Sequence, residues 1–394
     1  MTTNGNPIHL IIDKVKTNVG IVWFSLTFLT ALSKVLGSHI NNYYIYEYVY
    51  YHTIHLQNLF IPDSAYYQDV NHYGPLFSFV IAPFAILQDT IGPILWMLLN
   101  SWLLYYAINR LPFEKNQKNM ILWLILIEMM TTVSNMQFNG AIAALLVVSF
   151  LCVREGKDGT AAFLILFGFW IKLYTIVGLV FFFFSKNKLR FVLWSCFWAV
   201  ILFAAPMLIS SPSFILQTYR DWYDVLIEKN IGNLRDNFGS QNISVFGVCM
   251  YVFHIPEEYL HWVMVGGVLL CMMPYIRFRQ WGLNDFQLSG IASIMMFVVL
   301  FSTGSESSTY IIALTGAAIW IAHFKNSQSK WITYSIICGI VLTSLCPTDV
   351  IPEILKHDII RPYRIKAIVP TLIWLYIIYH SFFRIGNTQK AITE

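Results

Sequence analysis

The segment 161–184 is an apolar run of membrane-spanning length that carries one charged residue, Lys172. A lysine at the centre of a bilayer costs roughly 2.5–3.5 kcal/mol on insertion scales, so such a charge is kept where it faces a protein interior, an aqueous cavity or an anion. The run therefore predicts a membrane-embedded segment with a functional cation. A lysine that snorkels from the end of a helix is the plainer interpretation.

The overall composition supports a membrane protein. Hydrophobic residues make up 57% of the chain and charged residues 12%, and a soluble chain carries about twice that charged fraction. The hydrophobic residues fall in blocks of about 16–24, long enough to cross roughly 30 Å of hydrocarbon. We expect an all-α, polytopic integral membrane protein with about 10–12 transmembrane helices in a single domain, 1–394. This composition excludes a soluble enzyme.

The apolar blocks give the expected spans. They are 19–36, 75–88, 91–110, 119–134, 139–153, 160–184, 191–210, 258–276, 285–303, 307–323, 330–345 and 365–383. Three long polar connections separate them: a first outer loop, 38–74, a second large outer loop, 211–257, and the segment 346–364.

Basic residues in short loops predict the orientation, because such loops stay in the cytoplasm. Lys14, Lys16 and the basic segments 186–190, 277–279, 325–330 and 384–390 place both chain ends inside and the three long connections outside. Simple alternation then puts the basic segments 110–118 and 154–157 outside, against the rule. A re-entrant hairpin around Lys172 would remove part of this conflict, and the sequence leaves both arrangements open.

The same distribution limits the partners. The net charge of +4 comes from these short loops, so it indicates orientation rather than nucleic-acid binding. The six cysteines are scattered, with no CxxC or Cys/His spacing typical of a metal or redox site. We expect no cofactor and no metal centre, although an aspartate-bound divalent ion stays open.

The first outer loop is polar and rich in tyrosine. Its residues 43–56 have helical length and a mixed face, typical of a segment in the membrane interface. The tyrosines form either an interfacial belt or a platform for a sugar or lipid headgroup. Glu47 and Asp69 in this loop are carboxylates that could act as a general base toward a lipid-borne substrate. The plainer interpretation is that both are solvated loop charges.

Polar groups also interrupt the later apolar runs. Gln137 and Asn139 either end a helix or hydrogen-bond a polar ligand. Glu306, in the turn FSTGSESSTY, faces the same side as the first outer loop, as a substrate-facing carboxylate or a helix cap. Glu128 lies inside an apolar run, so we expect its carboxyl group either to pair with a cation or to be protonated.

Five sequence elements follow one another along the chain: NNYYIYEY, HYGPLFSFVIAPFAIL, MQFNGAIAALLV, GFWIKLYTIVGLVFFFF and GSQNISVFG. In this order they resemble motifs of glycosyltransferase family 87, membrane enzymes of the GT-C fold that use polyprenyl-phosphate sugars. Each is weak alone; their order and spacing over most of residues 20–320 carry the resemblance.

The resemblance implies a hexosyl- or mannosyltransferase of the cell membrane (inner or plasma membrane), with its active site on the extracytoplasmic side. It would transfer a sugar, with inversion, from a polyprenyl-phosphate donor to a lipid or glycan acceptor. The implied donor-binding residues are Lys172, Tyr174, His72, Gln137 and Asn139, and those near the acceptor or in supporting positions are Glu306, Tyr310 and Asn242.

Three positions depart from the family pattern. Asn42 stands where the family has the aspartate expected as catalytic base, and an amide does not accept the proton. Thr175 replaces a proline, and Tyr310 falls near an expected histidine. Asp69, just before HYGP, is our first substitute for the base, and Glu47 is the second.

Two other classes of function stay open. A transporter or flippase for a lipid-linked or anionic solute would also place Lys172 and Glu128 in a cavity. A non-catalytic family member would account for Asn42.

Overall fold

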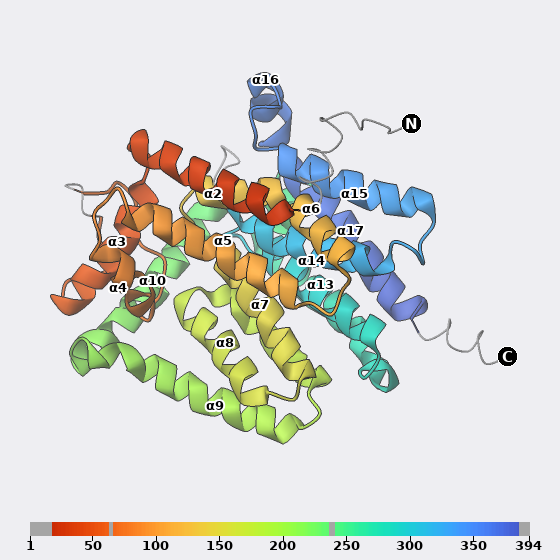
Figure 1. Cartoon of the computed structure of the whole chain (residues 1–394), viewed down its shortest axis with the longest axis horizontal. Helices are drawn as coiled ribbons and strands as arrows, with labels where there is room; N and C mark the ends of the chain where they lie inside the picture. The colour runs from red at the N-terminus through yellow and green to blue at the C-terminus, as the bar shows by residue number, and fades with distance from the viewer. Residues whose placement is uncertain (1–17, 63–65, 236–240, 386–394) are drawn as a thin grey trace, which may run out of the picture.

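The computed structural model describes residues 18–62, 66–235 and 241–385, and these form helices with no β-strand among them. Lys14, Lys16 and Lys390 lie outside the described residues. Figure 1 shows the helices packed side by side, with α3, α4 and α10 gathered at one end. The helices are α2 (Val19–Leu36), α3 (Asn41–Ile54), α4 (Phe77–Ala85), α5 (Gly92–Arg110), α6 (Lys115–Ser134), α7 (Asn139–Arg154), α8 (Asp158–Ile171), η1 (Leu173–Phe184), α9 (Lys188–Ala204), α10 (Pro212–Leu234), α11 (Val245–Tyr251), α12 (Leu260–Met272), α13 (Asn284–Leu300), α14 (Tyr310–Phe324), α15 (Lys330–Leu345), α16 (Glu353–Leu355) and α17 (Ile365–Phe383).

The fold class predicted from composition is confirmed: the chain is all-α and has several membrane-length helices. Within the described ranges, five helical stretches are long and apolar enough to cross a membrane, and five shorter apolar helices accompany them. The five long stretches are Val19–Leu36, Lys188–Leu208, Glu257–Ile276, Ser307–Phe324 and Ile365–Phe383. Ser307–Phe324 is the central one, with 89% of its window buried among other helices.

The segment 160–184 is a hairpin, so of the two arrangements that the sequence left open the hairpin around Lys172 is confirmed and the single span is wrong. Lys172 has extended backbone angles and separates α8 from η1, a 3-10 helix. The legs run antiparallel, because Thr175 Oγ1 donates to the carbonyl of Ile165 at 2.7 Å and Ser185 Oγ donates to the carboxylate of Asp158 at 2.9 Å. Lys172 therefore stands at the tip of a hairpin.

The predicted span 75–88 is also corrected. There the structure has only α4, a helix of 9 residues that contains Pro83. At ~1.5 Å per residue such a helix rises only about 14 Å, too short to cross hydrocarbon. The chain stays at one end of the bundle, since the hydroxyl of Tyr43 on α3 donates to the carbonyl of Phe84 at 2.9 Å.

The two corrections together resolve the conflict over the basic loops. Without a span at 75–88, the segments 110–118 and 154–157 fall at the inner end of the bundle, and the hairpin then keeps 186–190 at that same end. The described segments α2, α5, α6, α7, α8, η1, α9, α12, α13, α14, α15 and α17 run alternately between the two ends of the bundle. The short loops meet at the end opposite α3: Arg110 pairs with Glu155 at 2.8 Å, and Arg154 donates to Asn284 at 2.8 Å. The basic residues at 110–118, 154–157 and 186–190 thus share one end, as the charge rule requires.

A buried ion pair joins the middle of the bundle to its last helix. Lys366 Nζ lies 2.8 Å from Glu128 Oε1, and the side chains are 3% and 0% exposed. The expectation that Glu128 pairs with a cation is therefore confirmed.

Candidate functional site

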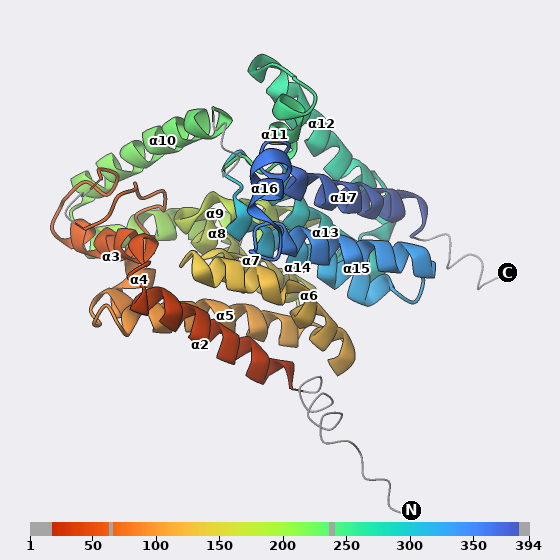
Figure 2. The same cartoon turned by 90° about the horizontal axis from the view of Figure 1, so that it is seen from above.

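A cavity of about 580 Å³ opens at the end of the bundle that carries the long connections. Its walls come from α3, the chain at 69–73, the tip of the α8–η1 hairpin, α10 and the turn 302–306. Figure 2 shows α3 and α10 on the same side of the bundle. Its polar lining residues are Asn42, Tyr46, Asp69, His72, Tyr73, Gln137, Lys172, Tyr174, Lys229, Asn230, Asn233, Gln241, Ser302, Thr303 and Glu306.

Lys172 is held at the cavity wall by neutral groups. Its Nζ donates to Asn139 Oδ1 at 2.8 Å and lies 5.2 Å and 5.3 Å from the ring centres of Tyr73 and Tyr174. None of the carboxylates in the described ranges lies within ion-pair distance of it. Because none of these carboxylates contacts it, such a cation is available to attract an anion that enters the cavity.

A second cation, Lys229, which the sequence analysis missed, comes from α10. Trp222, Leu226, Lys229 and Asn233 recur at helical spacing and all line the cavity. That periodicity was the signal that could have found Lys229, because residues three and four apart share a helix face. The cavity therefore presents two ammonium groups, from elements that are far apart in sequence.

His72 lines the same cavity, near enough to both cations to feel their charge, and is neutral at physiological pH. Burial first, and then the charge of Lys229, lowers the pKa of His72 to about 4. Its carbonyl accepts a hydrogen bond from Trp222 Nε1 at 2.9 Å, which ties the 69–74 segment to α10. A neutral imidazole there contributes a hydrogen bond to a ligand but no positive charge.

The segment that carries Asp69 and His72 also packs against the hairpin tip. The amide of Gly74 donates to the carbonyl of Ile171 at 3.0 Å, next to Lys172. A Cβ at Gly74 would clash with the carbonyl oxygen of Trp170, so the close approach needs glycine.

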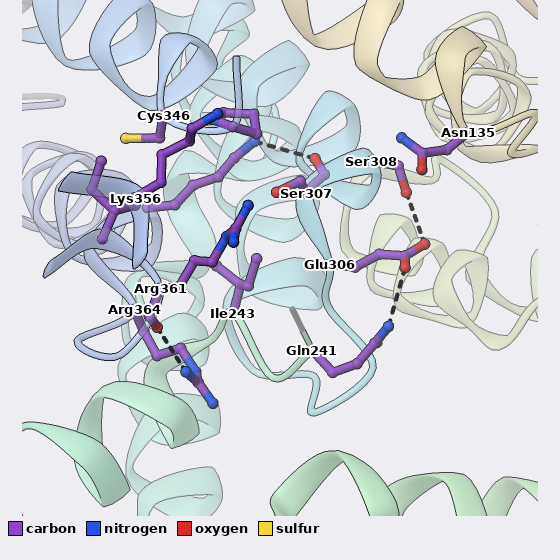
Figure 3. Close-up of a pocket in the computed structure, with 13 residues that line it drawn as sticks. Asn135, Gln241, Ile243, Glu306, Ser307, Ser308, Cys346, Lys356, Arg361 and Arg364 are labelled. Carbon is purple, nitrogen blue, oxygen red and sulfur yellow. Dashed lines mark hydrogen bonds between the residues drawn. The ribbon is translucent and has the colours of Figure 1, made fainter. Parts of the chain in front are cut away.

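Two carboxylates share the cavity with Lys172: Asp69 and Glu306. Asp69 is exposed, and its Oδ1 accepts from the amide of Val70 at 2.8 Å. Glu306 accepts from Ser308 Oγ at 2.8 Å and from Gln241 Nε2 at 3.4 Å, as Figure 3 shows. These contacts leave both carboxylates at the edge of the cavity.

Glu47 does not line this cavity. It is 9% exposed, on the part of α3 that faces away from the cavity. Burial, with a smaller effect of the charge on Asp89, raises the pKa of Glu47 to about 7. Its surroundings are thus those of a packed helix rather than of a ligand site.

The other predicted residues fall into two groups. Asn42 lines the cavity and donates to the carbonyl of Asn135 at 2.9 Å; Gln137 and Tyr174 also line it. Behind the wall, Asn139 supports Lys172, Tyr310 donates to the carbonyl of Ile243 at 2.9 Å, and Asn242 is fully buried. Asn139, Tyr310 and Asn242 therefore have no surface in the cavity.

No group of three or more His, Cys, Asp or Glu side chains that could hold a metal ion occurs in the parts of the chain that the structure describes. What the cavity assembles is a pair of cations, a neutral imidazole, two carboxylates and amide groups. Such a set has the chemistry needed to bind an anion at the cations and to accept a proton at a carboxylate.

The family comparison agrees with this location. None of the curated protein sequences compared with the chain matches it. The model of glycosyltransferase family 87 matches residues 71–303, a range that includes His72, Gln137, Lys172 and Lys229 but begins just after Asp69. Since the match spans more than half of the 394 residues and most of the cavity wall, the chain belongs to glycosyltransferase family 87.

Proposed function

We propose that this membrane glycosyltransferase transfers a hexose, such as mannose, from a polyprenyl-phosphate donor to a lipid or glycan acceptor in the cavity around Lys172. The observation that carries the proposal is the position of Lys172 and Lys229, two cations without carboxylate partners among the described residues, in one cavity with two carboxylates. The donor's phosphate would bind the cations while its polyprenyl chain lies in lipid.

The reaction we infer is a direct displacement. The oxygen of an acceptor hydroxyl attacks the anomeric carbon and forms the new glycosidic bond. The bond from that carbon to the phosphate oxygen breaks, and polyprenyl phosphate leaves with the electron pair. Lys172 and Lys229 stabilise the charge on this leaving group, which is where a fixed cation in a low-dielectric site contributes most. One displacement inverts the anomeric configuration, and a monophosphate leaving group does not demand a metal ion.

The proton of the acceptor hydroxyl needs a base, and Asp69 is our first candidate. Asn42 lines the cavity but its amide does not accept a proton at neutral pH. Glu306 shares the cavity and is the second candidate, whereas Glu47 lies outside it. The basic short loops gather at the opposite end of the bundle, which supports an extracytoplasmic cavity.

Substitution of the three carboxylates tests the proposal. Radiolabelled polyprenyl-phosphate mannose is given to purified protein with membrane lipid extract as acceptor. We expect Asp69→Asn to lower the rate about 10²–10⁴-fold, the range for loss of a general base. Glu47→Gln, the matched control, should keep the wild-type rate.

Two results would contradict parts of the proposal. Full activity in Asp69→Asn with loss in Glu306→Gln would move the base to Glu306. No sugar transfer by the wild-type protein to any acceptor, together with solute uptake into proteoliposomes, would replace the transferase by a transporter.

A further inference from the structure

A second cavity, of about 470 Å³, adjoins the proposed donor cavity. Gln241 and Glu306 line both cavities and form the partition between them. On its far side the second cavity is lined by the segment 346–366, which lies beyond the range that the family model matches. Figure 3 shows Glu306 turned toward Gln241 and Ser308, away from the labelled basic side chains.

Four cations line this second cavity: Lys356, Arg361, Arg364 and Lys366. Lys366 is neutralised by the buried Glu128. Lys356 and Arg361 pair with Asp349 and Glu353, whose side chains are 105% and 63% exposed. The Arg361–Glu353 pair is exposed at both partners, 43% and 63%, and exposed ion pairs stabilise little, so Arg361 can exchange Glu353 for an entering anion at small cost. Lys356, whose side chain is only 6% exposed, shares Glu353 with Arg361 and lines the same cavity.

Arg364 is fixed in place by its own backbone and its neighbours. It is 1% exposed, has a left-handed φ of 52°, and its guanidinium carbon lies 4.1 Å above the ring centre of Tyr251. Its Nη1 donates to the carbonyl of Arg361 at 2.7 Å, which also orients the Arg361 turn. In Figure 3 the Arg361 side chain extends toward Ser307, into the cavity.

We propose that this cationic cavity binds a phosphate group of the acceptor. That the bound molecule is the acceptor rests on the proposed function, whereas the anion site itself does not. Arg361 and Lys356 bind the phosphate, with Arg364 holding the turn. An acceptor anchored there extends past Gln241 and Glu306 into the donor cavity, where its hydroxyl meets the sugar. The acceptor class is therefore a phosphate-bearing molecule.

The test compares two probes in a neutral detergent. Dihexanoyl phosphatidic acid represents a phosphate on a lipid, and farnesyl phosphate represents the donor's prenyl phosphate. Binding of each is measured to wild type, Arg361→Gln, Arg364→Gln and Lys172→Gln. The matched control is Arg384→Gln, an exposed arginine at the other end of α17.

We expect Arg361→Gln to weaken the binding of dihexanoyl phosphatidic acid at least 10-fold, and Arg364→Gln to weaken it as well. Lys172→Gln and Arg384→Gln should leave this binding unchanged. Farnesyl phosphate should show the reverse pattern, with loss only in Lys172→Gln. Arg361 is 43% exposed, so its substitution is compatible with folding even if the buried Arg364 does not tolerate change.

The phosphate site would be overturned if dihexanoyl phosphatidic acid bound Arg361→Gln as tightly as wild type, or if its binding fell equally in Arg384→Gln. Neither result would contradict the proposed function. If farnesyl phosphate bound Lys172→Gln as tightly as wild type, that result would instead contradict the proposed function. Glycerol 3-phosphate separates the sources of the phosphate. Arg361-dependent binding of glycerol 3-phosphate supports a soluble phosphorylated glycan, and Arg361-dependent binding of only the lipid probe supports a phospholipid headgroup.

Discussion

At the scale of single residues, the surroundings of each charge separate ligand-binding groups from structural ones. Lys172 and Lys366 are both lysines within apolar sequence, but Lys366 has Glu128 at 2.8 Å whereas Lys172 has only an amide at that distance. A buried pair cancels its own field, and a cation held by an amide does not. The sequence identified Lys172 because its cost in lipid is evident from hydropathy alone. It did not identify Lys229, whose polar helix carries no such cost.

The carboxyl group of Glu47 gives a prediction in pH. Its pKa rises from 4.5 to about 7 on folding, so between these values the folded protein binds a proton that the unfolded chain has lost. Stability from this group is present below pH 4.5 and is lost as the pH rises through 7. Glu47→Gln should therefore raise the free energy of unfolding at pH 8 by about 2–3 kcal/mol relative to wild type, with little difference at pH 4.5.

Thermal unfolding in detergent at several pH values measures this difference. His72, whose pKa is lowered to about 4, changes stability in the opposite direction between pH 4 and 6.5, but equally in wild type and variant. The difference between the two proteins therefore isolates Glu47. A difference that does not change with pH would show that this carboxyl is not buried as described.

At the scale of elements, the sequence predicted most helices well, because their apolar lengths and polar ends are explicit. It did not distinguish one long span from a hairpin at 161–184, since both legs are equally apolar and Lys172 is the only mark of the turn. η1, with 12 residues, rises roughly 24 Å as a 3-10 helix, which is why a run of one span's length accommodates two legs. The cavity depends on this turn, because it carries Lys172 to the end where α3 and α10 lie.

Close packing of the two legs predicts that Gly168 cannot be enlarged. A Cβ at Gly168 would lie 2.5 Å from Cγ2 and 2.7 Å from Oγ1 of Thr175 on the opposite leg. Gly168→Ala should destabilise the protein by about 1–3 kcal/mol, the usual effect of overpacking.

Gly266 on α12 is the matched control, because nothing lies within 4 Å of the position its Cβ would take. Gly266→Ala should leave the melting temperature unchanged or raise it, since alanine favours helix. Equal melting temperatures for both variants would indicate that the legs of the hairpin are not packed as described.

At the scale of the whole molecule, the segment beyond the family match completes the bundle. α17 packs against α13 and α15, and its Lys366 reaches Glu128 on α6, far away in sequence. The sequence predicted either a cationic partner or a protonated carboxyl for Glu128, and it did not identify the partner, because long-range pairing leaves no local pattern. The same limit applies to the meeting of Asp69, Lys172, Lys229 and Glu306, which only the fold brings together.

Because Glu128 and Lys366 form a buried ion pair, substitution of only one partner should lower the stability of the protein. Glu128→Gln leaves a buried ammonium without its counter-charge and should destabilise the protein by roughly 3–5 kcal/mol. Replacing both partners by apolar residues, Glu128→Leu with Lys366→Met, should recover much of that loss. Melting temperatures of the two variants test this, and a double variant less stable than Glu128→Gln alone would contradict it.

The binding position of the donor's phosphate tests the central claim most directly. A cryo-electron microscopy structure of the protein with polyprenyl phosphate should show the phosphate oxygens about 3 Å from Lys172 Nζ, at charge-assisted hydrogen-bond distance, with the prenyl chain leaving toward lipid. Asp69 or Glu306 should face the same site. A phosphate bound elsewhere on the bundle, with the cavity at Lys172 empty, would contradict the account.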